Sequence, residues 1–361
     1  MTASQPLPRA GIYRILVCRP NHRLGNTLLL TPLIDELRQL YPGAEVDIVS
    51  EGDIARDVFE DWFNVRQVFC LPRRGFKHPI AFLRTLGKIR RTRYDMIVDP
   101  VLRSGFSRTL TRLVPARYKL GFSDVPTNVL THAAPTAIAG AHMAQRPVNL
   151  VRWAAGVDTS RAHPPLRLFL SGAEKAEGRR VVDALIPPAN GDEPGLRIGI
   201  FGNATGSKRY GAPWWAEFMG TLGPALPTAR TLELIPAHGT SMLGTRWPGY
   251  YSSDIRRMAA VLAALDVFIT ADCGVMHLAV AAGVPTIGLF RATVLDVYIP
   301  YGHGNTGIHT GDANGRDTAR RVLDWIALLQ RVAPETSAPR PVRGGVMASP
   351  QRAEIARAML M

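Results

Sequence analysis

The sequence predicts an α/β protein built from two successive domains, each containing a parallel sheet. Its 361 residues are enough for about two domains of roughly 150 residues each. Short, continuously apolar segments, typical of strands buried on both faces of a parallel sheet, alternate with segments of helical periodicity. This alternation stops at a segment rich in Pro, Gly and acidic residues and then starts again, which predicts the boundary between the domains.

The first half of the chain contains the pattern of a βαβ unit. Residues 14–18 (RILVC) are predicted to form a buried strand, and a helix is expected from Thr27 to Leu40, ended by Pro42-Gly43. Further strands are expected at 45–50 (EVDIVS) and 95–99 (DMIVD). Strand, helix and strand at this spacing indicate an α/β domain with a parallel sheet.

The second half repeats the theme after the break at residues 187–195. Strands are expected at 196–201, 231–235, 266–270 and 286–290. Helices are expected from about Pro213, at 253–265 and at 275–282. The two halves predict paired Rossmann-like domains facing a cleft. The Gly-x-Gly-x-x-Gly fingerprint of dinucleotide-binding enzymes is absent after the first strand, which disfavours a nicotinamide enzyme.

These patterns predict four segments along the chain. An N-terminal domain is expected at 1–185, a linker at 186–195 and a C-terminal domain at 196–332. A Pro-rich tail follows at 333–361, with a terminal helix opened by Ser349-Pro350.

Composition excludes several classes of protein. With 46% hydrophobic and 20% charged residues, the chain falls in the range of soluble globular proteins. No apolar run reaches the ~18–20 residues of a membrane span, and the apolar segment near the N-terminus is too short for a signal peptide. Cys18, Cys70 and Cys273 have no metal-binding spacing and cannot form a disulfide framework. We therefore expect a cytoplasmic protein.

The positive charge of the chain is unevenly distributed. The net charge is +14, and residues 73–119 alone contain 13 Lys and Arg against two Asp, a net +11. Such a concentration favours an anionic partner, such as a phosphorylated substrate or the anionic inner face of a membrane. The alternative is a solvated basic surface that keeps the protein soluble. A nucleic-acid-binding protein is a weaker reading, because the segment has no nucleic-acid motif or stacking aromatics.

One predicted loop has the features of a phosphate site. Residues 271–277 follow a predicted strand and open a helix, so free backbone N–H groups and the helix dipole favour an anion there. Gly274 would let the backbone approach a phosphate closely, and His277 lies one turn further on. Taken singly, Asp272 could be a helix cap and His277 a surface histidine.

Three segments together resemble a known family. The segment ADCGVMHLAVAAGVPTIGLF at 271–290 is similar to the C-terminal signature of glycosyltransferase family 9, the ADP-heptose:lipopolysaccharide heptosyltransferases, written D-(S/T)-G-x-x-H-L-A-A-A-x-G-x-P. Residues 14–49 resemble the first βαβ unit of that family, written R-x-x-x-x-G-D-x-x-x-T-x-P. GNATGSKRYGAPWWAEF at 202–218 resembles the opening of its second domain. The matches occur in order across residues 14–302.

The resemblance implies a two-domain GT-B fold and an inverting glycosyltransferase. A nucleotide sugar, with ADP as its nucleotide, would bind the C-terminal domain, and the acceptor would bind the N-terminal domain. The donor-binding residues that it implies are Lys208, Asp272, Cys273, Gly274, Val275 and His277. Cys273 replaces the usual Ser or Thr, and a thiol is the weaker hydrogen-bonding group. Glu233 and the loop 236–238 are further candidates for the base or ribose.

The catalytic base departs from the family pattern. Asn26 stands where the resemblance implies the Asp that deprotonates the acceptor hydroxyl, and an amide cannot take that proton. His22, Asp99 and Asp124 are alternative bases. Asn26 is also a preferred residue for the N-cap of the helix expected from Thr27.

The acceptor is expected to be an anionic glycan or glycolipid, such as lipopolysaccharide core. Arg19, Arg23, Arg103 and Arg108 are the candidate acceptor-binding residues, because guanidinium groups bind carboxylates and phosphates bidentately. No Asp-x-Asp motif stands at a strand end and no His/Cys cluster has metal-ligand spacing, so we expect no metal and no cofactor beyond the nucleotide sugar. The alternative function is a non-catalytic homologue that binds a nucleotide sugar or glycan.

Overall fold

The computed structural model describes residues 5–73, 75–187, 195–302 and 304–332. Two compact units are distinguished, Met1–Leu323 and Asp324–Met361, and both sheets belong to the first. Within the described residues, none of the helices has the length and apolarity needed to cross a bilayer. The terminal helix expected at 351–360 lies outside them.

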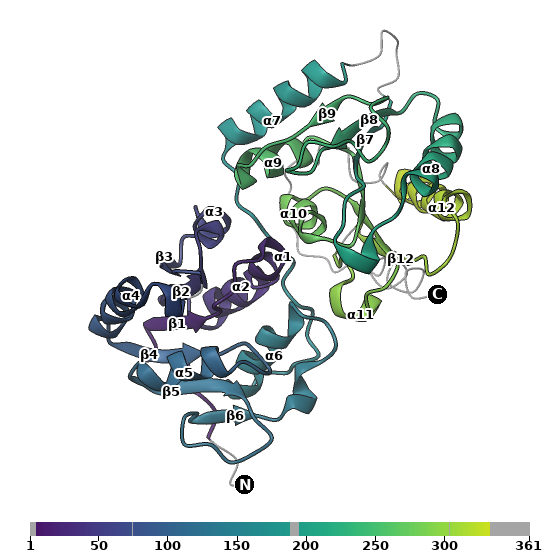
Figure 1. Cartoon of the computed structure of the whole chain (residues 1–361). Coiled ribbons are helices and arrows are strands. Elements are labelled where there is room, and N and C mark those ends of the chain that lie inside the picture. Colours follow the sequence, from purple (N-terminus) through teal and green to yellow (C-terminus); the bar gives the residue numbers. More distant parts are fainter. Residues whose placement is uncertain (1–4, 74, 188–194, 303, 333–361) are drawn as a thin grey trace, which may run out of the picture. The chain divides into compact units, whose positions relative to one another are not determined.

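The first sheet has six parallel strands in the order β3-β2-β1-β4-β5-β6 (Figure 1). Its strands are β1 (Arg14–Cys18), β2 (Glu45–Glu51), β3 (Val65–Leu71), β4 (Tyr94–Val98), β5 (Ala116–Phe122) and β6 (His132–Ala134). Its helices are α1 (Leu24–Leu28), α2 (Thr31–Leu40), α3 (Ile54–Phe59), α4 (Pro79–Arg91), α5 (Gly105–Leu113) and α6 (Gln145–Ala154).

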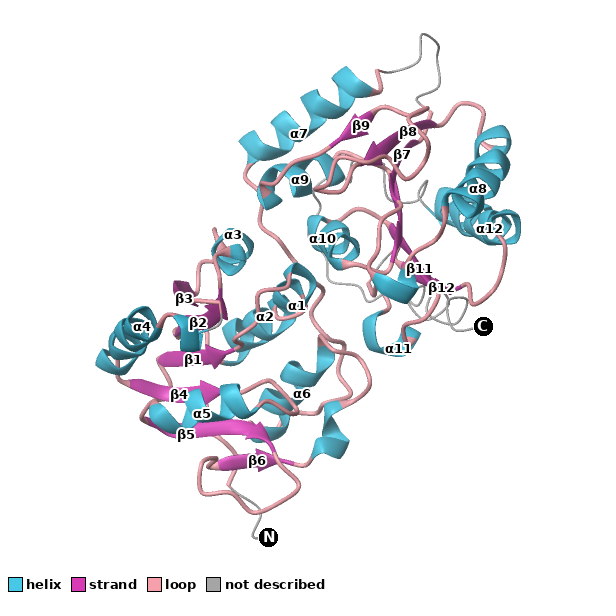
Figure 2. Cartoon of the chain, viewed as in Figure 1, coloured by secondary structure: helices cyan, strands magenta, loops and turns pink. Residues whose placement is uncertain are grey.

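The second sheet also has six parallel strands, in the order β12-β11-β10-β7-β8-β9 (Figure 2). Its strands are β7 (Arg197–Phe201), β8 (Arg230–Leu234), β9 (Gly249–Tyr250), β10 (Val267–Ala271), β11 (Thr286–Phe290) and β12 (Thr306–His309). The helices of this half are α7 (Gly172–Leu185), α8 (Ala212–Ala225), α9 (Ile255–Leu262), α10 (Gly274–Ala282), α11 (Leu295–Tyr298) and α12 (Gly315–Val332).

Alternate residues of β1 enter two different cores, as expected for a strand buried on both faces. Ile15 and Val17 pack in a cluster with residues of α1, α2 and α6. Leu16 and Cys18 pack in a second cluster with residues of α4 and α5. Helices α4 and α5 therefore cover the same face of the first sheet.

The prediction of one continuous helix from Thr27 to Leu40 is wrong. The structure has two helices there, α1 and α2, with Pro32 in the first turn of α2. Proline has no N–H to donate to the carbonyl of Leu28 four residues earlier, and its ring clashes with that carbonyl in a continuous helix. The Thr31 hydroxyl donates to the Leu28 carbonyl instead, at 2.7 Å.

The expected N-cap role of Asn26 is also wrong. Helix α1 begins at Leu24, so Asn26 is its third residue, and the N-cap is Arg23. The expected strands are confirmed to within a residue or two, whereas β3, β5, β6, β9 and β12 were not predicted.

Helix α7 packs on a helix of the second half. A Cβ atom on Gly178 would lie 2.1 Å from the Ala260 carbonyl oxygen, so only glycine allows the backbones of α7 and α9 to approach this closely. The predicted N-terminal domain at 1–185 includes α7, and its boundary stays a prediction.

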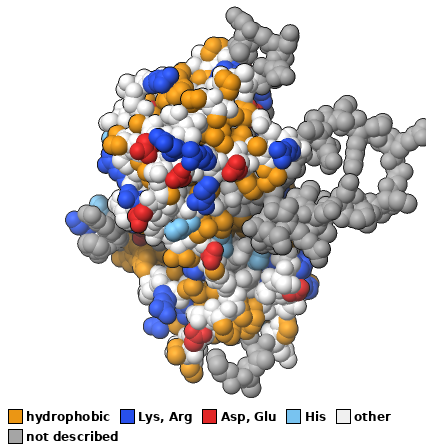
Figure 3. Space-filling view, turned by 90° about the vertical axis from the view of Figure 1, so that its right-hand side faces the viewer, with side chains coloured by type: hydrophobic (Ala, Val, Ile, Leu, Met, Phe, Trp, Pro, Cys, Tyr) orange, Lys and Arg blue, Asp and Glu red, His pale blue; other side chains and the backbone are white. Residues whose placement is uncertain are grey.

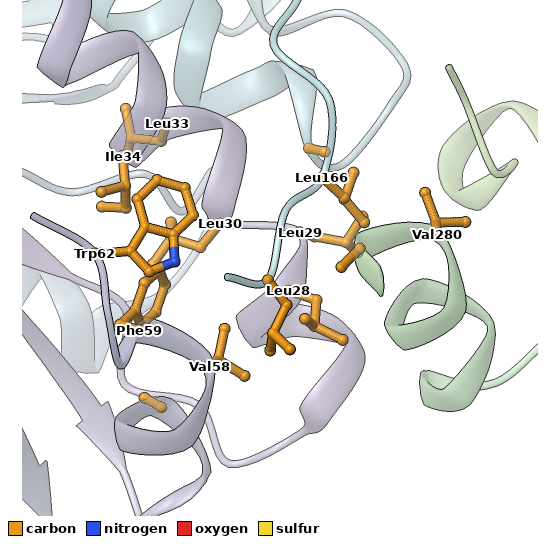
Figure 4. Close-up of a cluster of buried hydrophobic side chains, with 14 of the residues drawn as sticks. Leu28, Leu29, Leu30, Leu33, Ile34, Val58, Phe59, Trp62, Leu166 and Val280 are labelled. Carbon is orange, nitrogen blue, oxygen red and sulfur yellow. The ribbon is translucent and has the colours of Figure 1, made fainter. Parts of the chain in front are cut away.

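A cluster of buried hydrophobic side chains holds α1 in place (Figure 4). It contains Leu28 of α1, Leu29 directly after it, Leu166, and Val280 of α10. The Leu168 N–H donates to the Ala281 carbonyl at 2.9 Å beside it. These contacts lie towards the C-terminal end of α10, and Gly25 of α1 lies against Gly274 at its N-terminus.

Candidate active site

The loop between β10 and α10 exposes the backbone of a helix N-terminus. Cys273 is the N-cap of α10 in an extended conformation, and its side chain makes no capping hydrogen bond. Its Sγ lies 3.5 Å from the Thr270 hydroxyl, and burial raises the pKa of the thiol. The thiol is therefore neutral and adds no negative charge at a helix N-terminus, a position that favours an anion.

Lys208 and Asp272 meet at this loop. Lys208 ends the short 3-10 turn Gly206–Lys208 after β7, and Asp272 follows β10, the neighbouring strand. Because these strands are parallel, their carboxyl ends meet at one edge of the sheet. The Lys208 Nζ lies 2.6 Å from an Asp272 carboxylate oxygen and 5.8 Å from the centre of the Tyr298 ring. A cation that keeps a third of its side chain exposed is thus held at the site.

His277 is buried one turn into α10. Burial lowers the pKa of its imidazole to about 4, so the ring is neutral at pH 7 and can bind an oxygen only by a hydrogen bond. A Cβ atom on Gly25 would lie 3.0 Å from the His277 Cδ2 and 3.3 Å from the Gly274 Cα. Two glycines thus allow the backbones of α1 and α10 to come together.

These residues line a pocket of about 560 Å³, which we call the Lys208 pocket. All six predicted donor-binding residues line it: Lys208, Asp272, Cys273, Gly274, Val275 and His277. The other lining residues are Arg23, Leu24, Gly25, Asn26, Leu29, Phe201, Asn203, Ala204, Thr205 and Tyr298. Sequence reasoning missed Tyr298 and Asn203, which no motif singles out.

A second pocket of about 490 Å³, the Arg19 pocket, adjoins it. Arg19, Arg103 and Arg146 line this pocket, and none of its lining residues is acidic. Burial lowers the pKa of the Arg19 guanidinium, and the positive charge of Arg146 acts in the same direction. The pocket is suited to an anion. The role of Arg146 was not predicted, because its segment carries no recognisable pattern.

Asn26 lines both pockets. Its Nδ2 donates to the Asn21 Oδ1 at 3.2 Å, and the Arg23 backbone N–H donates to the same oxygen at 2.8 Å. Because a backbone N–H can only donate, it identifies the Asn21 atom as oxygen and hence the Asn26 atom as nitrogen. The loop is thus matched to an amide at position 26.

None of the three alternative bases lines either pocket. His22 lies 3.3 Å from a Glu51 carboxylate oxygen and is about half exposed. Asp99 is buried, and it accepts hydrogen bonds from the Ser107 hydroxyl at 2.6 Å and from Arg108 Nε at 2.9 Å. Burial raises the pKa of Asp99. As bases, all three residues stay predictions.

The structure separates the four predicted acceptor-binding arginines. Arg19 and Arg103 line the Arg19 pocket, whereas Arg23 lines the Lys208 pocket. Arg108 lines neither, since it pairs with Asp99 and donates to the Phe122 carbonyl at 2.9 Å. Arg108 therefore stabilises the fold beside the pocket.

Glu233 and Asp124 are also engaged within the fold. Glu233 is buried and accepts hydrogen bonds from the Met242 and Leu243 N–H groups and the Ser241 hydroxyl. Asp124 accepts hydrogen bonds from the Thr136 N–H and hydroxyl. In the described part of the chain, no group of three or more His, Cys, Asp or Glu is arranged to hold a metal ion.

Comparisons with known proteins show which family and which structures this chain resembles. Residues 253–322 match the family model of glycosyltransferase family 9 (heptosyltransferase). The glycosyl transferase family 9 structure from Veillonella parvula is 18% identical, with a TM-score of 0.68 over 96% of this chain and 97% of that one. E. coli heptosyltransferase WaaC, solved with ADP, is 20% identical, with a TM-score of 0.67 over 87% and 99% of the two chains. E. coli ADP-heptose LPS heptosyltransferase II is 18% identical, with a TM-score of 0.65 over 89% and 100%. No curated protein matches by sequence.

These matches confirm the resemblance to glycosyltransferase family 9 and the predicted fold. The two parallel six-stranded sheets with their helices form the GT-B fold of the heptosyltransferase structures. The family-model match includes the 272–277 loop.

Proposed function

We propose that this protein is an inverting glycosyltransferase. It moves a heptose from an ADP-sugar to a hydroxyl of an anionic glycan such as lipopolysaccharide core. The observation that carries the proposal is that Asn26 lines two adjoining pockets. One has a cation and a free helix N-terminus, and the other has three arginines and no acid. This arrangement suits a diphosphate in the Lys208 pocket and an anionic acceptor in the Arg19 pocket.

In the proposed reaction the acceptor hydroxyl attacks the anomeric carbon on the face opposite the diphosphate. A C–O bond to the acceptor forms, the bond to the diphosphate oxygen breaks, and the hydroxyl proton passes to a base. Lys208 and the N–H groups at the start of α10 stabilise the charge that develops on the leaving ADP. When the diphosphate binds, Lys208 exchanges part of its interaction with Asp272 for the phosphate oxygens.

The acceptor side of the proposal rests on Arg19, Arg103 and Arg146. Their guanidinium groups bind a carboxylate or phosphate on the glycan and so orient the attacking hydroxyl. The proposal includes no metal and no further cofactor, because the chain supplies the groups that meet the diphosphate charge. It places the protein in the cytoplasm, in peripheral contact with the inner face of the membrane where a lipid-linked acceptor would lie.

Calorimetric titration with ADP, UDP, GDP and CDP, without added metal, tests the donor. We expect ADP to bind at least tenfold more tightly than the other nucleotides, and addition of EDTA to leave its affinity unchanged. Preference for another nucleotide would overturn the ADP-sugar donor while leaving the fold unaffected. Absence of binding by all four would overturn the donor site itself.

A non-catalytic homologue is the second candidate, because an amide occupies position 26. Asn26→Asp distinguishes the two. The new carboxylate oxygen would lie about 3.2 Å from the Asn21 Oδ1, where the Asn26 amide nitrogen now lies, and the two oxygens would repel each other. The Asn21 oxygen cannot turn away without losing its hydrogen bond from the Arg23 N–H. For an active enzyme we therefore expect kcat on the order of tenfold lower, with ADP affinity little changed.

The control for this substitution is Asn26→Ala, which removes the amide without adding charge. Asn26→Ala should lower kcat less than Asn26→Asp does. If the natural chain is inactive and Asn26→Asp creates turnover, the non-catalytic function is supported instead.

A further inference from the structure

We propose that the outer faces of α4 and α5 form a docking surface for an anionic lipid bilayer, with the first turns of both helices entering the headgroup region. We call this surface the α4–α5 face. It is made of the exposed residues Lys77, Ile80, Leu83, Arg84, Lys88, Arg91, Phe106, Arg112 and Leu113. Binding of lipid does not depend on the sugar-transfer chemistry proposed above.

The charge of this face has one sign. The sequence has no Asp or Glu from Phe63 to Tyr94, or from Pro100 to Ser123, and these two segments contain α4 and α5. The basic side chains of α4, including Arg84 and Lys88 on one side of the helix, are exposed, as is Arg112 of α5, whereas Arg108 pairs with Asp99. By contrast, the side of the molecule that Figure 3 shows carries acidic side chains beside basic ones. A face with cations alone is complementary to anionic headgroups.

Apolar side chains project from the same two helices. Ile80 is 66% exposed and Leu83 is 62% exposed, although Leu86 and Ile89 of the same helix are buried in the core. Phe106 in the first turn of α5 is 39% exposed. Exposed apolar residues beside cations are the pattern of a surface that inserts into the interfacial region of a membrane.

The apolar residues of the two helices lie together. The rings of Phe82 and Phe106 have their centres 6.0 Å apart, which joins the first turn of α5 to the start of α4. Both helices lie against the same face of the first sheet (Figure 1). Arg103, which lines the Arg19 pocket, stands two residues before the start of α5. A bilayer at this face would therefore lie near the pocket proposed for the acceptor.

The exposed apolar residues favour a lipid surface over a nucleic acid. Phosphate backbones are bound by cations alone and gain nothing from exposed Ile80 and Leu83. Insertion of these side chains between lipid headgroups removes their apolar area from water, which stabilises the bound state. The basic residues and the apolar residues thus contribute separately, and each contribution can be removed by substitution.

Co-sedimentation of the full chain with vesicles tests the proposal. We expect binding to phosphatidylcholine vesicles containing 30% phosphatidylglycerol, and at least tenfold weaker binding to phosphatidylcholine alone. Arg84→Gln with Lys88→Gln should weaken binding to the anionic vesicles about thirtyfold, since each cation near such a surface contributes about 1 kcal/mol. The matched control is Lys175→Gln with Arg179→Gln, exposed cations at the same spacing on α7, and it should bind within twofold of the natural chain.

The apolar contribution has its own variant. Ile80→Ser with Leu83→Ser should weaken vesicle binding about tenfold. Val125→Ser is the control, because Val125 is 65% exposed and lies outside the α4–α5 face. ADP affinity, measured by calorimetry, should be the same in all these variants, which separates failure of this proposal from failure of the donor site.

Three outcomes would overturn the proposal. The first is equal binding to neutral and anionic vesicles, and the second is an equal loss of vesicle binding when the two cations of α4 or the two cations of α7 are replaced. The third is unchanged vesicle binding in Ile80→Ser with Leu83→Ser. Binding of a single-stranded RNA more tightly than the anionic vesicles, lost in Arg84→Gln with Lys88→Gln, would assign the face to nucleic acid instead.

Discussion

Replacement of Lys208 by alanine is expected to lower kcat/KM for sugar transfer about 10²–10³-fold, the effect of removing one preorganised group that stabilises developing charge. Lys208 is the one lysine lining the Lys208 pocket, and its Nζ is held 2.6 Å from Asp272 at the carboxyl end of the sheet. Loss of the ammonium group leaves the N–H groups of α10 and the Arg23 guanidinium to meet the diphosphate charge.

Initial-rate kinetics with the donor varied would measure this effect, and calorimetry with ADP would measure its binding component. Lys175→Ala, which removes an exposed lysine of α7, is the control and should leave both unchanged. Lys208→Arg should retain more activity than Lys208→Ala, because it keeps the charge. If Lys208→Ala has the same kcat/KM as the natural chain, Lys208 is not part of the site.

Replacement of Arg152 by methionine is expected to destabilise the first half of the chain by about 3–5 kcal/mol. Arg152 and Glu36 are both 2% exposed and form a bidentate ion pair with distances of 2.9 and 2.8 Å. Arg152 also donates to the carbonyls of Arg161 and Ala162. The substitution leaves the buried Glu36 charge without its partner and removes the donor to both carbonyls, which is the costly way to break such a pair.

Urea unfolding followed by circular dichroism would measure the loss. Arg152→Met with Glu36→Leu should be more stable than Arg152→Met alone, because it removes the buried unpaired carboxylate. Arg180→Met, which breaks an exposed pair with Glu177, is the control and should change stability by less than about 1 kcal/mol. An equally small change in Arg152→Met would show that water reaches Glu36.

Sequence patterns located the part of the candidate site that we propose for the diphosphate because this part is local. The buried strand ending at Ala271, the loop at 272–273 and the helix from Gly274 are adjacent in the chain. A strand, a glycine and a helix N-terminus in that order bring backbone N–H groups to one point whatever the rest of the fold does. The five predicted donor-binding residues from Asp272 to His277 line one pocket for this reason, whereas Lys208 joins them because β7 and β10 are neighbouring strands.

Sequence patterns were less informative about charged side chains, whose partners are distant in the chain. Arg108 and Arg103 look alike in sequence, yet Arg108 pairs with Asp99 while Arg103 lines a pocket with Arg146. The register of β4 against β5 and the position of α5 decide which arginine is neutralised. That choice depends on which charges become neighbours on folding, because a charge is buried only beside a partner.

The sequence by itself predicted the two parallel sheets and a helix opening after the loop that follows Ala271, because these follow from apolar runs and local backbone preferences. Only the tertiary structure decided that Asn26 lies within a helix, donates to Asn21 and borders two pockets. The physical reason is that backbone geometry is specified over a few residues, whereas hydrogen-bond partners and pockets arise from side chains that only the complete fold brings together.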